Sequence, residues 1–157
     1  MLDDPMSGVK RRDLLTGLSA FAAAVAVSSP AHAQKGKAGA GVLSVPEYLV
    51  RAAMLLDETR RAQDWVGGHP GDIGLAALAL ELSLARAEAA AQIAAPASVK
   101  GAHMHLLMVI ESTSASFDAN VRGEGKKAAQ RMSAARIEEQ TLVQALDAQK
   151  LKLPTLK

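Results

Sequence analysis

Apolar residues recur at spacings of three and four along four successive stretches of this chain, a pattern typical of amphipathic helices. The most apolar stretch, residues 102–117, reads AHMHLLMVIESTSASF, and we expect it to form the central helix of the fold. Its core stripe is expected to run through Leu107, Ile110, Ser114 and Phe117. The other three helices are then expected to pack around it.

The first helix is expected to begin near Ser44. Ser44, Pro46 and Glu47 together supply an N-cap serine, a proline in the first turn and the glutamate of a capping box. The glycine-rich segment 67–71 ends this helix. Its buried stripe is expected to contain Leu49, Ala52, Leu56, Thr59, Gln63 and Val66.

The second helix is expected to begin after Asp72, which can act as its N-cap, and to end before Pro96. Its leucines cover much of the helix circumference, so we expect it to be the most buried neighbour of the central helix. These leucines are Leu75, Leu78, Leu80, Leu82 and Leu84. Ser98 is the expected N-cap of the central helix.

The fourth helix is expected from about Lys126 to Lys150, and Pro154 prevents its continuation into the tail, residues 152–157. Its expected stripe is Ala128, Met132, Ala135, Glu139, Leu142 and Leu146. Short connections make successive helices antiparallel. The sequence therefore predicts an all-α, up-down-up-down four-helix bundle over residues 44–151.

Composition agrees with an all-helical domain and excludes several kinds of site. Aromatic residues make up only 3% of the chain, whereas strands favour aromatic and β-branched residues. Cysteine is absent, which excludes disulfides, iron–sulfur clusters and covalently attached haem. The 18 basic residues nearly balance the 16 acidic ones, and no basic run has interleaved aromatics, so nucleic-acid binding is not expected.

Residues 1–33 have the organisation of a cleaved signal peptide. Basic residues precede an apolar run at 14–27, and Ala31 and Ala33 provide the small-x-small pattern of a signal peptidase site. The run is too short to cross about 30 Å of hydrocarbon comfortably, so we do not expect a permanent membrane span. Residues 34–43, rich in glycine and lysine, are expected to form a flexible linker.

Arg11 and Arg12, followed by Asp13, Leu14 and Leu15, resemble the bacterial twin-arginine export signal. The resemblance covers the leader alone and implies contact with the twin-arginine translocase and signal peptidase, and a periplasmic or secreted location. Twin-arginine substrates generally cross the membrane folded, often with a cofactor already inserted. A general secretory signal with a chance arginine pair is the alternative interpretation of the leader.

One cluster in the central helix has metal-binding chemistry. His103, Met104, His105 and Met108 offer imidazole and thioether ligands, a combination that suits copper and particularly Cu(I). On a helix, however, residues two apart point about 200° from each other, which separates the two histidines. Met54 of the first helix is expected at a similar height and could complete a metal site or a His/Met pair for non-covalent haem b.

Signatures of enzymes are missing from the sequence. There is no His-Glu-x-x-His, no Gly-x-Ser-x-Gly, no phosphate-binding glycine-rich loop and no Glu-x-x-His pair of a di-iron bundle. Glu111 could be a buried carboxylate with a raised pKa or a residue of the solvent-facing stripe. We therefore predict a non-enzymatic binding or interaction protein of unknown protein or small-molecule ligand, with a copper- or haem-binding bundle as the alternative.

The arginine pair generates a test of export. Replacing Arg11 and Arg12 by lysine should trap the unprocessed precursor inside the cell, because the twin-arginine machinery reads the guanidinium pair. Immunoblotting of cell fractions measures the ratio of precursor to processed protein. Undiminished export of the double variant would assign the leader to the general secretory route.

Overall fold

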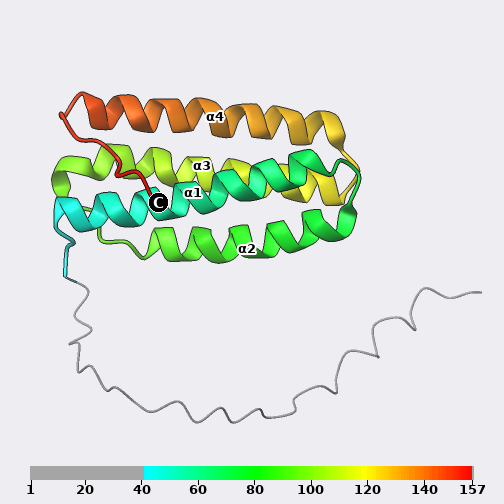
Figure 1. Ribbon diagram of the computed structural model, residues 1–157, viewed down its shortest axis with the longest axis horizontal. Coiled ribbons are helices and arrows are strands. Elements are labelled where there is room, and N and C mark those ends of the chain that lie inside the picture. Colours follow the sequence, from blue (N-terminus) through cyan, green and yellow to red (C-terminus); the bar gives the residue numbers. More distant parts are fainter. Residues whose placement is uncertain (1–40, 157) are drawn as a thin grey trace, which may run out of the picture. The chain divides into compact units, whose positions relative to one another are not determined.

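The computed structural model describes residues 41–156. The predicted signal peptide, with its arginine pair and cleavage site, lies outside the described residues, as does most of the predicted linker. The described part contains four helices and no strand: α1 (Val45–Gly68), α2 (Ile73–Ala91), α3 (Lys100–Val121) and α4 (Gly125–Asp147), with a short 3-10 turn, Ala97–Val99, before α3. Successive helices run antiparallel (Figure 1), which confirms the predicted all-α four-helix bundle.

The starts of α1 and α2 follow the capping chemistry that the sequence predicts. The backbone N–H and the hydroxyl of Ser44 both donate to the Glu47 carboxylate, at 2.9 and 2.6 Å. The Asp72 carboxylate accepts a hydrogen bond of 2.9 Å from the Leu75 N–H. The Ser44 N–H and the Leu75 N–H each thereby gain an acceptor that the backbone of the first helical turn does not supply.

The start of α3 differs from the prediction, because Ser98 is not its N-cap. Ser98 lies within the 3-10 turn, and α3 follows directly with no side-chain cap. A 3-10 turn at a helix start uses tighter backbone hydrogen bonds in place of a cap, here from the Val99 N–H to the Pro96 carbonyl. At the other end, Gly123 takes φ +73°, a left-handed conformation that lets the chain reverse into α4.

Helix α3 is the centre of the bundle, because it packs against all three other helices, most extensively against α4 and α2. Ile110 and Phe117 are fully buried, whereas Leu107 is partly buried beside the core. The predicted stripe of α3 is therefore correct except that Leu107 lies at its edge. Glu111 is exposed, so the interpretation of this residue as a buried carboxylate is wrong and the solvent-facing one is correct.

The expected stripes of α1 and α4 are largely confirmed. On α1, Ala52, Leu56, Thr59 and Val66 are buried, while Leu49 and Gln63 are partly buried. On α4, the buried residues are Ala128, Ala135, Leu142 and Leu146, while Met132 and Glu139 are partly buried. Tyr48, Ala53 and Ala62 join the buried set of α1, which is wider than one stripe.

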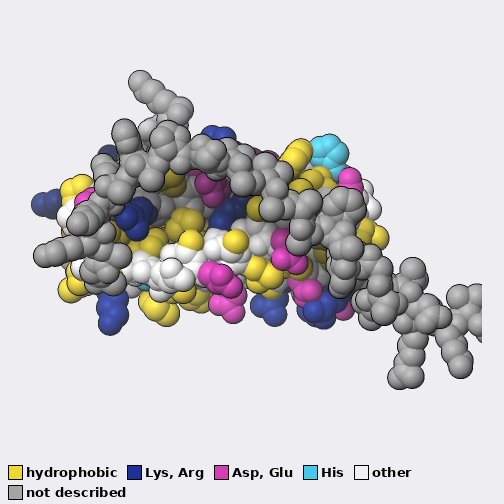
Figure 2. Space-filling model, turned by 90° about the horizontal axis from the view of Figure 1, so that it is seen from below, with side chains coloured by type: hydrophobic (Ala, Val, Ile, Leu, Met, Phe, Trp, Pro, Cys, Tyr) yellow, Lys and Arg dark blue, Asp and Glu magenta, His cyan; other side chains and the backbone are white. Residues whose placement is uncertain are grey.

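The expectation that α2 is the most buried neighbour of α3 is wrong. Its buried residues are small, namely Ala76, Ala79, Ser83 and Ala90. Leu78, Leu82 and Leu84 are 53%, 48% and 47% exposed. Small side chains let two helix backbones approach closely, which turns the leucines outward. The face of the molecule on which α2 lies accordingly carries hydrophobic side chains among acidic and basic ones (Figure 2).

A buried hydroxyl pair marks the close approach of α2 and α3. The Ser83 and Ser114 hydroxyl oxygens lie 2.7 Å apart, and both residues are buried. The Ser114 hydroxyl also lies 2.9 Å from the Ile110 carbonyl of its own helix, to which it can donate. Because each hydroxyl has a hydrogen-bond partner, burying the pair leaves no hydroxyl unsatisfied.

The two apolar residues at the middle of α3 generate a matched test of the core. Ile110→Ala should reduce the free energy of unfolding by about 2–5 kcal/mol, through lost burial and the cavity that it leaves. Leu107→Ala should cost less, because part of its side chain already contacts solvent. Denaturant unfolding followed by circular dichroism measures both. An equal or larger loss for Leu107→Ala would show that the rotation of α3 differs from the one described.

Candidate functional site

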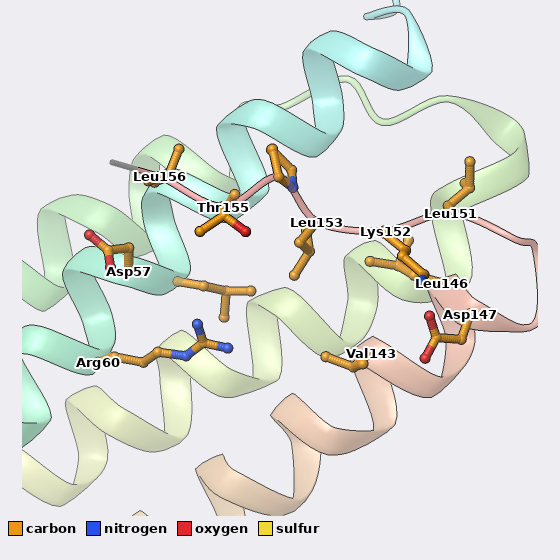
Figure 3. Close-up of a pocket in the computed structure, with 13 residues that line it drawn as sticks. Asp57, Arg60, Val143, Leu146, Asp147, Leu151, Lys152, Leu153, Thr155 and Leu156 are labelled. Atoms are coloured by element: carbon orange, nitrogen blue, oxygen red, sulfur yellow. The ribbon is translucent and has the colours of Figure 1, made fainter.

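A groove between α1 and α4 combines apolar and charged side chains. Its volume is about 410 Å³, and one of its walls is the C-terminal tail (Figure 3). The lining residues are Ala53, Leu56, Asp57 and Arg60 of α1, Val143, Leu146 and Asp147 of α4, and residues 151–156 of the tail. The tail therefore helps to form a cavity.

The groove exists because α1 and α4 pack only weakly against each other. A side-chain contact spans the gap: the Arg60 Nε donates to Glu139 Oε1 at 2.7 Å. Leu56 and Leu146, which are buried, form the apolar floor. The groove between α1 and α4 thus has core residues at its base, and the Arg60–Glu139 ion pair links the two helices across it.

The course of the tail follows from the end of α4. The Leu151 N–H donates to the Leu146 carbonyl at 3.0 Å, and Lys150 takes φ +59°, so the chain reverses at once. Leu151 and Leu153 then pack against the main core cluster. The predicted tail is thus part of the packed structure, because its leucines bury apolar surface that the gap between α1 and α4 leaves open.

Charges at the rim of the groove are balanced. Asp57 and Asp147 provide two carboxylates, while Arg60 and Lys152 provide two cations. Two of these groups already have ion-pair partners, since Asp57 lies 2.8 Å from Arg61 and Arg60 pairs with Glu139. The rim consequently has no excess of one sign of charge that would select an ion.

A second cavity of about 420 Å³ lies where the α1–α2 and α3–α4 connections meet. Its walls include Val66, Ile73 and Met132, together with glycines of both connections. His69, which also lines it, has its Nδ1 2.9 Å from the Trp65 carbonyl oxygen. This cavity has fewer charged side chains than the groove, so it offers less to orient a ligand.

The structure separates the residues of the predicted metal cluster. His103 is buried and its ring meets that of Tyr48 edge-on, with the centroids 5.7 Å apart. The Nδ1 of His105 lies instead 2.8 Å from Glu138 Oε2 of α4. Met104 and Met108 are on the exposed side of α3, 54% and 41% exposed. Each histidine therefore faces a different helix, as the 200° separation predicts.

Met54, the predicted partner from α1, has an exposed side chain. His103 instead contacts Tyr48, which also belongs to α1 and precedes Met54 by six residues. Within residues 41–156 no group of three or more histidine and acidic side chains is arranged to hold a metal ion. Copper or haem binding by these residues stays a prediction.

Tyr48 and His103 form a buried polar pair. The Tyr48 hydroxyl and the His103 Nδ1 have no hydrogen-bond partner among the described residues. Burial raises the pKa of Tyr48 to about 12 and lowers the pKa of His103, because a low-dielectric environment disfavours both charged forms. His103 is therefore held as a neutral imidazole.

The groove was not predicted from the sequence, although one signal for it is present. Leucines at positions 151, 153 and 156 alternate with polar residues around Pro154, an apolar pattern that a solvated tail would not need. The weak packing of α1 and α4 has no comparable signal, because it depends on how closely α3 approaches each neighbour.

The lowered pKa of His103 generates a pH-dependent stability. In the unfolded chain histidine takes up a proton near pH 6.5, whereas His103 in the folded protein takes it up only at lower pH. Stability should therefore fall as the pH decreases below about 6.5 and level off once the pH is below the folded-state pKa of His103, with a total loss of about 1.4 kcal/mol for each unit of pKa difference. His103→Phe should remove this part of the slope in urea unfolding at several pH values, and His69→Gln should not. Identical slopes for wild type and His103→Phe would contradict the prediction.

Known proteins offer no further guide to the groove or to the histidines. Comparisons of the chain with protein families, with curated proteins and with solved structures find no match.

Proposed function

We propose that this protein is an exported, non-enzymatic binding protein whose ligand site is the groove between α1, α4 and the C-terminal tail. The observation that carries the proposal is the cavity of about 410 Å³ with an apolar floor and a charged rim. Small-molecule sites typically enclose about 300–1,000 Å³ and combine apolar walls with a few polar groups. The ligand class that fits is a small apolar or uncharged amphiphilic molecule.

The walls of the groove support an apolar ligand. The buried side chains of Leu56 and Leu146 line the groove, together with Val143, Leu153 and Leu156. Covering such surface is favourable by about 25 cal/mol for each Å² removed from water. A ligand with a short hydrocarbon portion would gain most of its affinity in this way.

The rim supports a ligand without net charge. Arg60 and Asp57 are already engaged by Glu139 and Arg61. The other two charged groups of the rim, Asp147 and Lys152, are opposite in sign, so the rim favours neither an anionic nor a cationic headgroup. A hydroxyl or amide headgroup could still exchange hydrogen bonds with these side chains. The pairing of Asp57 and Arg60 with neighbouring charged side chains supports a binding role over catalysis.

Export is supported by the leader, in which Arg11 and Arg12 precede the apolar run and Ala31 and Ala33 supply the cleavage pattern. Within the described part of the chain, none of the helices combines the length and the hydropathy needed to cross a membrane. The proposed location is the periplasm or the exterior of a bacterial cell, reached through the twin-arginine translocase and signal peptidase.

A blocking variant tests the groove as the ligand site. Val143→Trp places an indole in the groove from a position that is already exposed, and Ile137→Trp adds the same side chain to an exposed position of α4 that does not line the groove. Displacement of a fluorescent apolar dye by 1-decanol measures the affinity. We expect Val143→Trp to weaken decanol binding by about tenfold or more, equivalent to roughly 1.4 kcal/mol, and Ile137→Trp to leave it unchanged.

Two results would contradict this proposal. Equal losses for the two tryptophan variants would place the binding elsewhere on the surface. Tighter binding of decanoate or decylammonium than of decanol, abolished by Arg60→Gln or by Asp57→Asn respectively, would replace the uncharged ligand class by a charged one.

A further inference from the structure

The outer face of α3 carries two exposed methionines that core packing does not explain. Met104 and Met108 are separated by one helical turn, and His105, adjacent to Met104 in the sequence, is partly exposed. Methionine commonly fills gaps inside cores, but these two thioethers point away from the core. The three side chains therefore form an accessible set on one side of the helix.

Helix geometry places Met108 between the other two ligands, Met104 and His105, which are themselves about 100° apart around the helix axis. With about 100° between successive residues, Met108 lies about 40° from Met104 and about 60° from His105 around the helix axis. Side chains three and four residues apart are neighbours, with Cβ atoms about 5–6 Å apart. His103 is excluded from this set, because its ring packs against Tyr48 on the inner side of α3.

The contact between His105 and Glu138 prepares the imidazole for metal binding. The Nδ1 of His105 lies 2.8 Å from Glu138 Oε2, so a neutral imidazole donates from Nδ1 and keeps the lone pair of Nε2 free. Histidines that bind metals almost always donate their other N–H to a carboxylate or carbonyl in this way, which fixes the tautomer and raises the basicity of the ligand. Glu138 thus supplies the partner that a ligating histidine needs.

We propose that Met104, His105 and Met108 form a Cu(I) site on the outer face of α3, with Glu138 as the residue that positions His105. Two thioethers and one imidazole are soft and intermediate ligands, a set that favours Cu(I). Zinc prefers thiolate, imidazole and carboxylate ligands, so the thioethers add nothing to its binding. This site is separate from the groove, and neither proposal depends on the other.

The test measures Cu(I) binding to the full chain under anaerobic conditions, in competition with a chromophoric Cu(I) chelator. We expect one Cu(I) per chain, and a loss of about tenfold or more in affinity for Met104→Leu and for Met108→Leu, which keep the side-chain volume but remove sulfur. Met54→Leu is the matched control, because Met54 is 49% exposed but lies on another helix. Residues 1–40 are common to all variants and contribute the same background.

Two further variants separate positioning from general structure. Glu138→Gln should weaken Cu(I) binding by about 10–100-fold without changing the melting temperature of the copper-free protein, and Glu138→Asp should restore part of the affinity. Zn(II) binding should be the same for wild type and for the methionine variants, which distinguishes a thioether site from capture by histidine alone.

The proposal is overturned if the Met104→Leu, Met108→Leu double variant retains wild-type Cu(I) affinity. It is also overturned if Met54→Leu weakens Cu(I) binding as much as that double variant does. It is also overturned if His69→Gln removes the bound copper and His105→Gln leaves it in place. Melting curves of the copper-free variants identify any substitution that acts by unfolding the bundle, and leucine at an exposed helical position should leave them unchanged.

Discussion

The close packing of α3 against its neighbours is the constraint on which the rest of this structure depends. α3 contributes side chains to both core clusters and contacts each of the other three helices. Its interface with α2 is made of alanines and the Ser83–Ser114 hydroxyl pair, so these two backbones approach closely. Because α3 takes up so much of the interior, α1 and α4 are left with weak mutual contact.

The sequence predicted those parts of the fold that depend on local chemistry. The starts of α1 and α2, at Ser44 and Asp72, were predicted from polar side chains that can accept hydrogen bonds from free backbone N–H groups. The buried stripes of α1 and α4 were predicted from helical periodicity. The prediction for α2 was wrong, because counting leucines ignores how closely two helices can approach through small residues. Ser98 likewise has the chemistry of a cap, but the 3-10 turn after Pro96 had already set the start of α3.

The candidate sites differ in how far the sequence could reveal them. The separation of His103 from His105 follows from helix geometry alone, and the structure adds that one contacts Tyr48 and the other Glu138. To predict those two contacts one must know how α3 is rotated about its axis relative to α1 and α4. The periodicity of apolar residues along one helix does not give that orientation. To predict the groove one must know how three separate segments are placed relative to one another. They are two helices from opposite ends of the described chain and a tail with no regular structure.

The return of the tail to α1 joins residues about a hundred positions apart in the sequence, such as Leu153 and Leu56. Contacts between successive helices close short loops and form early, whereas this contact has to wait until both α1 and α4 are in place. We therefore expect the seam between these helices to assemble late. Because α1 and α4 make little direct contact, we expect this seam to open locally while the rest of the bundle stays folded, with rapid hydrogen exchange beside the groove.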